Sequence, residues 1–506
     1  MKKIVKIGID FGTSYSFIGF KHGDVIMPLI SSRENYGIPS VFYYDGRQKL
    51  VGRQAHNQAE KKPEFGVRSV KRKLDEQPFV LAGETFTPDD VVYEILAAIV
   101  QGAEQQLELY MVDYDEMEAI ITVPVEFRET LKYRIRKAAE RITIKNGTKL
   151  RVTGVIPEPI AAAIEYFGVK NETDSTILVY DLGGGTFDAA IVRANEEGER
   201  IPYKILEQGG DKKLGGDDWD KVVADWLKEE YVKQTNGEVT PQVEKILLSE
   251  ARQIKEELTT MHEFDYQVVV KNTIFDVYIT RERFNQMTRH LLERSLKIVR
   301  ELVQKSTFPI NHVVLTGGSS YMPQVKEALE KEGIFPSTTD IRLVEPERAI
   351  AHGAARYAAT VEWSEELNEM DANQNPLIKL KATHSYGIRY RNNDDQEIII
   401  FMINKGEELP AQGSTVSYTR QENQKVSTFV VFESSSETTK NEEVLDKERF
   451  GDVVMELQIT RVSNEIPKGT ESTEFLTLSE EGVLHAKAVD HLEGHIVENK
   501  VNVNRV

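Results

Sequence analysis

Two turns of matching composition, far apart in the chain, constrain the fold of this sequence more than any other feature. Each turn follows a short apolar run and holds an aspartate, a hydrophobic residue, glycine and, in the turn or just after it, threonine. The first turn begins at Asp10 and the second at Asp181. A motif copied at such a distance indicates duplication of a whole lobe and not a short solenoid repeat.

The pattern of apolar residues over 1–362 alternates between strand and helix periodicity, which predicts an α/β fold. Apolar runs at 4–10 and 15–20 flank the first turn, and runs at 177–180 and 187–192 flank the second, so each turn is expected to close a hairpin. Asp45-Gly46 predicts a third hairpin. We expect helices after Thr87-Pro88, over 131–142, over 241–260, over 280–306 and from Met322.

The two turns also have the chemistry of a phosphate site. Backbone N–H groups of glycine-rich turns can surround a triphosphate, because glycine permits close approach and unusual backbone angles. The sequences 12–14 and 183–186 would form two such cradles with hydroxyl groups as extra donors. Asp10 and Asp181 would then hold a hydrated magnesium ion, which prefers oxygen ligands. Either turn alone is equally well explained as simple hairpin closure, but two matched copies favour nucleotide binding.

A third glycine turn supports this hypothesis more weakly. Residues 313–319 have the pattern of a strand, a tight turn with Gly317 and Gly318, and the start of a helix. A helix N-terminus there can approach a nucleoside or a phosphate. Glycine in such a turn also serves plain strand–helix packing, so this turn alone does not define a site.

The character of the sequence changes near Trp363. Residues 363–380 are mostly acidic and polar and predict a linker. Beyond them, β-rich segments at 397–403, 426–432, 453–459 and 483–489 predict a separate antiparallel β domain over 381–506. The predicted order is therefore a nucleotide-binding region at 1–362, the linker and the β domain.

Composition excludes several classes of protein. The chain has no cysteine, which rules out disulfides and a cysteine-ligated zinc site and suits a reducing compartment. Its formal net charge of −19 argues against nucleic acid or an anionic membrane surface as the main partner. The N-terminus lacks an apolar stretch of signal or membrane length, so we expect a cytoplasmic protein.

Several of these segments, in this order, resemble the Hsp70 chaperone family within the actin-like ATPase superfamily. The resemblance extends over nearly the whole chain, including the β domain. The segments that carry it are 9–16, 123–124, 158–163, 181–188, 214–220, 316–319, 345–349, 353–355, 482–484 and 488–490. It implies two duplicated ribonuclease-H-like lobes with ATP or ADP between them, followed by an antiparallel β-sandwich.

The resemblance also implies roles for individual residues. Asp10 and Asp181 would hold hydrated Mg²⁺ and K⁺ ions, and Thr186 and Asp188 would line the same site. Lys71 would stabilise the γ-phosphate and the attacking water, which Glu158 would help to orient. The residues expected to bind the nucleotide are Gly12, Thr13, Ser14, Tyr15, Gly183, Gly184, Gly185, Gly215, Gly216, Lys255, Thr259, Gly317, Gly318, Ser319, Tyr321 and Glu347.

Some residues depart from the family pattern around the base and in the linker. Tyr321 stands where the family has an arginine that clamps adenine, and a tyrosine can still stack on the base. In the opposite clamp, Lys255 and Thr259 match, whereas the acidic residue upstream has become Arg252. The linker keeps its apolar core at 377–380 but lacks the flanking acids, so coupling between the domains is expected to be weak or different.

Further departures concern the partners. Gly154 and Pro157 replace an arginine and an asparagine that contact the J-domain cochaperone, and Lys132 replaces the arginine of the relay helix. We therefore do not expect a conventional J-domain partner.

The resemblance places the peptide site at Ile388, Tyr390 and Arg391, of which Tyr390 and Arg391 are the arch residues. An arginine in the arch favours acidic or polar peptides. A solvated charge at a strand end explains Arg391 equally well. The helical lid of the family is expected to be absent, because the sequence ends at Val506.

Three functions remain open from the sequence. The favoured one is an ATP-hydrolysing, lid-less chaperone that couples its nucleotide state to the binding of extended or unfolded polypeptide. The second is a nucleotide-dependent scaffold or sensor whose β domain docks one dedicated protein partner. The third is a sugar-kinase-like phosphotransferase, which the C-terminal β domain disfavours.

Overall fold

The computed structural model describes residues 2–30, 37–196, 202–270, 273–344, 348–361, 363–364, 369–370, 378–391, 396–434, 442–444, 453–479 and 483–500. The chain divides into two compact units. Unit 1 comprises Met1–Val125, Ala138–Val152 and Ile156–Thr360, and unit 2 comprises Glu126–Lys137, Thr153–Val155 and Val361–Val506.

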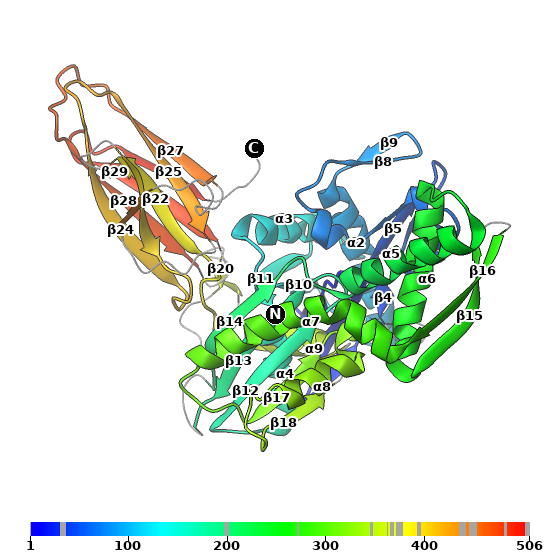
Figure 1. The fold of residues 1–506 in the computed structure, drawn as a ribbon. Helices are drawn as coiled ribbons and strands as arrows, with labels where there is room; N and C mark the ends of the chain where they lie inside the picture. Colours follow the sequence, from blue (N-terminus) through cyan, green and yellow to red (C-terminus); the bar gives the residue numbers. More distant parts are fainter. Residues whose placement is uncertain are drawn as a thin grey trace. The chain divides into compact units, whose positions relative to one another are not determined.

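Unit 1 is built from mixed sheets with helices packed against them (Figure 1). Its first large sheet has the neighbour order β10-β1-β2-β3, and its second has the order β18-β17-β12-β13-β14. In both sheets a central strand has one parallel and one antiparallel neighbour: β1 pairs with β10 and β2, and β12 pairs with β17 and β13. The two matched turns thus occupy equivalent places, each joining such a central strand to its antiparallel neighbour.

The strands before residue 158 are β1 (Ile4–Asp10), β2 (Tyr15–His22), β3 (Val25–Pro28), β4 (Ile38–Pro39), β5 (Val41–Tyr44), β6 (Lys49–Val51), β7 (Gly66–Arg68), β8 (Phe79–Leu81), β9 (Glu84–Phe86), β10 (Glu116–Val123) and β11 (Arg151–Pro157). The strands that follow are β12 (Ser175–Leu182), β13 (Phe187–Ala194), β14 (Tyr203–Asp211), β15 (Glu263–Val270), β16 (Thr273–Thr280), β17 (His312–Thr316) and β18 (Asp340–Leu343).

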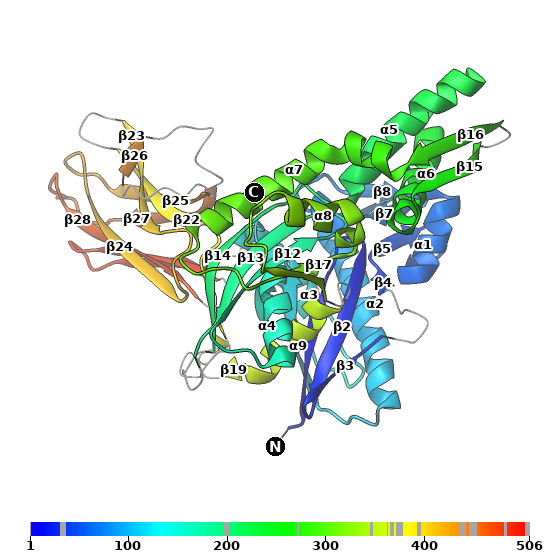
Figure 2. The same ribbon diagram turned by 60° about the horizontal axis from the view of Figure 1, so that its bottom comes forward.

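The helices are α1 (Gly52–Lys61), α2 (Pro88–Leu109), α3 (Glu129–Glu140), α4 (Glu158–Lys170), α5 (Gly216–Thr235), α6 (Pro241–Thr260), α7 (Arg281–Lys305), α8 (Pro323–Lys331) and α9 (Ala349–Thr360). Short 3-10 turns occupy Pro63–Phe65, Val70–Lys73 and Gly318–Tyr321. Helix α6 lies beside the hairpin of β15 and β16 (Figure 2).

Local sequence explains where these helices begin. The Thr87 hydroxyl accepts a hydrogen bond from the backbone N–H of Asp90, whose carboxylate accepts one from the backbone N–H of Thr87. This capping box satisfies two N–H groups that the first turn of α2 leaves without helical partners. Thr240 and Thr280 cap α6 and α7 with a single hydrogen bond each, in which the threonine hydroxyl accepts from the backbone N–H three residues on. The predicted helix starts near these threonines are confirmed.

Close backbone contact fixes α9 against the first sheet. A methyl group on Gly8 would lie 2.2 Å from the backbone nitrogen of Ala355, and one on Gly353 would lie 1.7 Å from the carbonyl oxygen of Ala161 in α4. Glycine is therefore required at both contacts, since no side chain fits between the backbones. The resulting contact of α9 with β1 and α4 holds the end of β1, where Asp10 lies.

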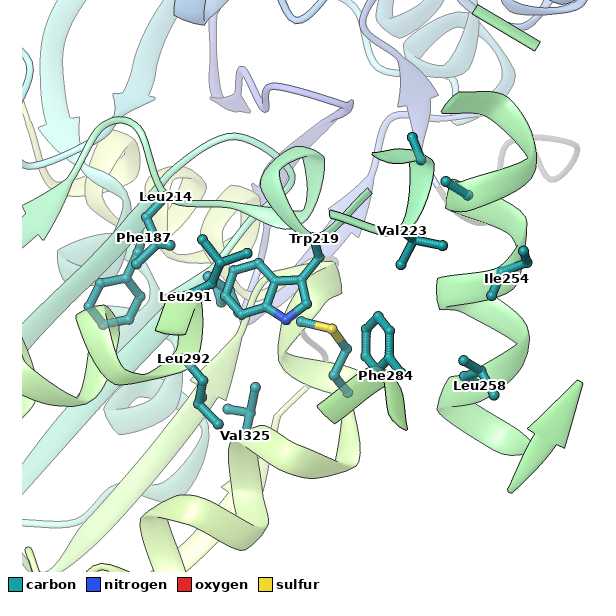
Figure 3. Close-up of a cluster of buried hydrophobic side chains, with 14 of the residues drawn as sticks. Phe187, Leu214, Trp219, Val223, Ile254, Leu258, Phe284, Leu291, Leu292 and Val325 are labelled. Carbon is teal, nitrogen blue, oxygen red and sulfur yellow. The ribbon is translucent and has the colours of Figure 1, made fainter. Parts of the chain in front are cut away.

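A large apolar cluster forms the core beneath the second turn (Figure 3). Trp219, in the first turns of α5, is fully buried there and lies among Leu291, Phe284 and Val223. Burying an indole ring removes a large apolar area from water. The packing of Trp219 anchors the start of α5, and with it the adjoining glycine pair at 215–216.

The described residues of unit 2 form two large antiparallel sheets. Their neighbour orders are β26-β23-β22-β25-β27 and β24-β28-β29-β30. The strands of unit 2 are β19 (Trp363–Ser364), β20 (Glu369–Met370), β21 (Ile378–Lys379), β22 (Ser385–Arg391), β23 (Glu397–Ile403), β24 (Ala411–Tyr418), β25 (Val426–Ser434), β26 (Glu442–Val444), β27 (Val453–Thr460), β28 (Glu471–Leu478), β29 (Leu484–Asp490) and β30 (Ile496–Lys500).

Buried polar side chains link these two sheets. The fully buried Arg461 donates to Ser427 in β25 at 2.9 Å, to Ser472 in β28 at 2.9 Å and to Asp490 in β29 at 2.7 Å. The Tyr390 hydroxyl in β22 donates to Glu474 in β28 at 2.8 Å. The sheets therefore face one another across these contacts.

The structure confirms the strands predicted in the C-terminal region and the hairpins predicted at both aspartate turns. It also differs from the sequence prediction in the predicted linker, where β19 and β20 pair as two short antiparallel strands. Residues 371–377 of that linker lie outside the described part of the chain. Across the described residues, no helix combines the length and the apolar character that crossing a membrane requires.

Candidate functional site

The first aspartate of the repeated turns is the last residue of β1. Asp10 is buried, and its Oδ1 atom accepts a hydrogen bond from the Thr122 hydroxyl at 3.0 Å. Thr122 lies directly opposite Asp10 in the parallel pairing of β1 and β10. Burial raises the pKa of Asp10 to about 7, and the negative charge of Glu158 contributes to this rise.

The second aspartate lies at the end of β12. Asp181 is buried, and its Oδ1 atom accepts no hydrogen bond from any described residue. Burial is the main reason that the pKa of Asp181 lies well above its ordinary value. The negative charges of Glu158 and Asp10 raise this pKa further. Two carboxylates at the ends of equivalent strands therefore share one buried site, in which the charge of Lys71 compensates the negative charge only in part.

The two glycine-containing turns meet directly. A methyl group on Gly184 would lie 2.0 Å from the Ser14 hydroxyl oxygen, and one on Gly185 would lie 2.4 Å from Cγ2 of Thr13. The backbone N–H of Gly183 donates to the carbonyl of Thr186 at 3.0 Å, which closes the second turn on itself. The two turns are thus packed directly against each other.

The start of α5 adds a third segment to this site. The backbone N–H of Gly216 donates to the carbonyl of Gly183 at 3.0 Å, and a methyl group on Gly215 would overlap the backbone of Gly185. A methyl group on Gly216 would lie 2.4 Å from the Ser319 hydroxyl oxygen. The glycine pair at 215–216 therefore joins the second turn to the third.

The third glycine turn also reaches Asp181. Gly317 has a φ of +78°, and a methyl group on it would lie 2.5 Å from Oδ1 of Asp181. Only glycine suits both the backbone angle and this contact. Gly318 has open space beside it.

A buried ion pair lies beside the two aspartates. Lys71 Nζ donates to Glu158 Oε1 at 2.6 Å, and both side chains are almost fully buried. The ammonium also lies 5.6 Å from the centre of the Phe11 ring, within the range of a cation–π contact. Glu158 is the first residue of α4, so its carboxylate lies at the positive end of the helix dipole.

Asp188, which follows the second turn, is close enough to Glu158 and Asp181 for their charges to affect it. Asp188 Oδ1 accepts a hydrogen bond from the backbone N–H of Val125 at 2.6 Å, whereas Oδ2 has no partner among the described residues. Burial raises the pKa of Asp188, as do the charges of Glu158 and Asp181. Thr186 is also buried.

The structure gives fewer contacts among the residues proposed to bind the base than among those of the two aspartate turns. Lys255 lies 3.2 Å from the carbonyl of Gly216 and 2.7 Å from a carboxylate oxygen of Asp220, while the Thr259 hydroxyl donates to the Lys255 carbonyl at 3.1 Å. Tyr321 exposes 39% of its surface. Glu347 lies outside the described residues.

The proposed peptide residues all lie on β22, in unit 2. Ile388 is buried, the Tyr390 hydroxyl donates to Glu474, and the exposed Arg391 forms an ion pair with Glu397 at 3.4 Å. The hydroxyl of Tyr390 is thus already occupied within the unit.

Several polar residues around the site were not singled out from the sequence. Thr122 holds Asp10, and the Ser69 hydroxyl donates to Asp217 at 2.7 Å. Arg72 pairs with Asp218 at 3.1 Å. Of these contacts, only the one between Thr122 and Asp10 could be predicted, and only once the register of β1 and β10 is known. The other contacts join segments that share no local sequence pattern.

The donor set fits a hydrated cation. The described residues include no group of three or more His, Cys, Asp or Glu side chains arranged to hold a metal ion. Asp10 and Asp181 nevertheless offer buried carboxylate oxygens, and Oδ1 of Asp181 has no hydrogen-bond partner within the described ranges. Magnesium commonly takes one or two carboxylates and completes its shell with water and substrate phosphates, so two carboxylates suffice.

A family model described as Hsp70 protein matches residues 6–80 and 75–505, and the chain belongs to the Hsp70 family. A chaperone protein HscA homolog of Methylibium petroleiphilum is 31% identical over 380 residues, which cover 70% of this chain and 58% of that protein. A chaperone protein DnaK of Deinococcus proteolyticus is 29% identical over 457 residues, which cover 83% of this chain and 67% of that protein. The chain thus spans about three fifths to two thirds of the length of these relatives.

Proposed function

We propose that this chain is a chaperone-type ATPase, in which unit 1 binds and hydrolyses ATP and unit 2 binds extended or unfolded polypeptide. The observation that carries the proposal is the meeting of two matched turns around the buried carboxylates of Asp10 and Asp181. Membership in the Hsp70 family supports it. In this proposal, the two large sheets of unit 1 are the cores of duplicated actin-like lobes, and the two sheets of unit 2 form a β-sandwich.

The chain's own residues supply positioning and charge. The backbone N–H groups of the turns at 12–14 and 183–186 would hold the β- and γ-phosphates, with the hydroxyls of Thr13 and Ser14 as extra donors. Asp10 and Asp181 would hold hydrated Mg²⁺ and K⁺ ions, and Mg²⁺ would neutralise charge on the phosphates. Such a site accelerates phosphoryl transfer to water through electrostatic preorganisation.

Lys71 and Glu158 would act as a unit. The Lys71 ammonium is held by Glu158 and lies in a buried place, so its charge is poorly screened there. It would stabilise the negative charge that develops on the transferred phosphoryl group. Glu158 would orient the attacking water with the carboxylate oxygen that does not hold Lys71.

Unit 2 would bind peptide at β22, and ATP binding in unit 1 would weaken that binding. Arg391 at the strand end favours acidic or polar peptides over purely aliphatic ones. We expect no conventional J-domain partner, because Gly154 and Pro157 lack the side chains that such a partner would contact. We propose a cytoplasmic location and no nucleic acid or membrane as partner.

Peptide binding with and without nucleotide tests this function. Two pools of fluorescein-labelled extended peptides, one rich in acidic residues and one rich in leucine, are titrated with the full chain. The affinity of the acidic pool should fall at least roughly tenfold when Mg-ATP is added, a coupling of about 1.4 kcal/mol. An Asp10→Asn variant serves as the control, and its peptide affinity should ignore ATP.

Two results would speak against the proposal. If the chain is folded and binds ATP but its peptide affinity does not change when ATP is added, the proposed coupling between ATP binding and peptide binding is wrong. Stoichiometric capture of one folded protein, with no binding to either pool, would instead indicate a nucleotide-dependent scaffold with a dedicated partner.

A further inference from the structure

Helices α4 and α9 pack closely against each other (Figure 2). Glu158 begins α4. Ala161, Glu165 and Gly168 follow it at the spacing that places residues on one face of a helix. These three residues all contact α9. Glu158, which holds Lys71, therefore lies on the face of α4 that α9 covers.

A buried ion cluster joins the two helices on this face. The buried Glu165 carboxylate accepts a hydrogen bond from Nε of Arg356 at 2.5 Å and lies 3.7 Å from Nδ1 of His352. His352 and Arg356 lie one turn apart on α9, so both reach the same carboxylate. The arginine fits because α4 has glycine opposite it: a methyl group on Gly168 would lie 2.9 Å from Cδ of Arg356.

The cluster holds Glu165 as a buried carboxylate. Burial raises the pKa of Glu165, but the hydrogen bonds and charges of His352 and Arg356 outweigh this effect, and the pKa lies below its ordinary value. The other close contact between the helices, that of Gly353 with Ala161, involves small residues with little relief. Directional bonds between charged groups therefore specify the register of α4 on α9.

Other residues of α9 contact the strand that ends at Asp10. A methyl group on Gly8 of β1 would lie 2.2 Å from the backbone nitrogen of Ala355 and 2.7 Å from the carbonyl oxygen of Ala351. Helix α9 is thus in contact both with β1 and with α4, the helix that begins at Glu158. The register of α4 on α9 therefore determines where the Glu158 carboxylate lies relative to Asp10.

We propose that Glu165, Arg356 and His352 are positioning residues for ATP hydrolysis, which act through α4 by holding Glu158 in place beside Lys71. This role rests on the ATPase activity proposed for unit 1. The cluster lies further along α4 than Glu158, so its loss should affect the hydrolysis step and leave the binding of ATP by the glycine turns largely intact.

Single-turnover hydrolysis of Mg-ATP by the full chain, measured together with the Kd for ATP, tests the proposal. Glu165→Gln should slow hydrolysis roughly tenfold, because a small displacement already impairs a catalytic group, while Kd changes less than about twofold. Glu165→Gln/Arg356→Gln should be equally slow, and it avoids leaving Arg356 buried without its partner. Arg356→Lys retains a charge-assisted bond to Glu165 and should keep most of the wild-type rate.

Arg193→Gln is the matched control. The Arg193 side chain is 17% exposed and pairs with Asp174, whereas that of Arg356 is 19% exposed and pairs with Glu165. Arg193 lies in β13 and not between α4 and α9, so its variant should hydrolyse ATP at the wild-type rate. If Arg193→Gln slowed hydrolysis as much as Glu165→Gln, general loss of stability would explain both results and the positioning role would be overturned.

The reactivity of Lys71 provides a second measurement that does not depend on hydrolysis. The nucleotide-free chain is acetylated at trace level with isotopically labelled acetic anhydride, and the labelling of Lys71 is normalised to that of the exposed Lys331. A buried amine paired with a carboxylate reacts slowly. Glu165→Gln should raise the labelling of Lys71 at least roughly threefold, because a displaced Glu158 leaves the amine more open, and Arg193→Gln should not.

The two measurements separate this proposal from the proposed ATPase activity. If wild type hydrolyses ATP, wild-type rates in folded Glu165→Gln and in the double variant would overturn the positioning role. If wild type does not hydrolyse ATP, the proposed activity is wrong, and the labelling decides. Unchanged labelling of Lys71 in Glu165→Gln would then overturn the cluster's hold on Glu158, whereas raised labelling would establish it.

Discussion

Glu474 carries a buried carboxyl group whose protonation should control the stability of unit 2. It lies in β28, accepts hydrogen bonds from the Tyr390 and Ser417 hydroxyls at 2.8 Å each, and is 1% exposed. Burial raises its pKa from 4.5 to about 7. Replacing it with glutamine keeps the shape and the hydrogen-bonding capacity but removes the ionisation.

The direction in which pH changes the stability of unit 2 follows from the protonation of Glu474 in the folded and unfolded states. Between pH 4.5 and about 7, the unfolded chain ionises Glu474 while the folded chain keeps it protonated. The unfolded state then binds fewer protons, so the stability of unit 2 falls as the pH rises through this window and levels off above it. At about 1.4 kcal/mol per tenfold change in proton concentration, the total loss is about 3 kcal/mol.

Hydrogen exchange of backbone amides in β24 and β28 measures this loss within the full chain, because protection reports the free energy of local opening. After correction for the intrinsic pH dependence of exchange, protection in wild type should decrease from pH 5 to pH 7. Glu474→Gln should flatten that decrease. Glu456→Gln, at an exposed position of β27, is the control and should leave it unchanged. Equal slopes in wild type and Glu474→Gln would refute the reasoning.

Two further predictions concern the site in unit 1. Asp10→Asn should weaken magnesium-dependent ATP binding at least roughly tenfold in isothermal titration, the loss expected from a charged ligand of the ion; an unaltered magnesium requirement would contradict this role. Gly184→Ala should weaken ATP binding to a similar degree, because its methyl group would lie 2.0 Å from the Ser14 hydroxyl oxygen. Gly102→Ala is the control, because Gly102 lies in α2 outside the proposed site and nothing lies within 4 Å of a methyl group placed there; equal ATP affinities of the two alanine variants would argue against the close packing of the two turns.

The repeated turns show what the sequence predicts well. The aspartate, glycine and threonine spacing predicts two hairpins, and β1–β2 and β12–β13 form at those places. Each turn relies on residues near one another in the chain, so local pattern is sufficient. That Asp10 and Asp181 lie in one buried site also follows, because each ends an equivalent strand.

Contacts between distant segments could not be predicted in this way. Arg252 pairs with Asp217 and Asp220 from another helix, and Lys71 pairs with Glu158 across the unit. For Lys71, sequence pattern alone gave only a basic run, and the family resemblance supplied the role. The Arg252 contacts depend on how α5 and α6 pack, which periodicity does not specify.

The buried polar links in unit 2 illustrate the same limit. Arg461 and Glu474 are polar residues in strands or at strand ends, where an alternating pattern predicts solvent exposure. Both are buried between the sheets because hydroxyl and carboxyl partners from facing and neighbouring strands satisfy them. Such partners are visible only once the strand register is known.

Single-turnover hydrolysis of Mg-ATP by wild type and by Lys71→Met tests the central claim most directly. Methionine fills the volume of the lysine stem and removes its charge, and a parallel Lys71→Met/Glu158→Gln variant avoids leaving Glu158 buried without its partner. Both variants should still bind ATP, while hydrolysis should slow at least roughly 100-fold, a loss of about 3 kcal/mol of transition-state stabilisation. Hydrolysis at the wild-type rate in a folded, ATP-bound variant would contradict a catalytic site between the two turns.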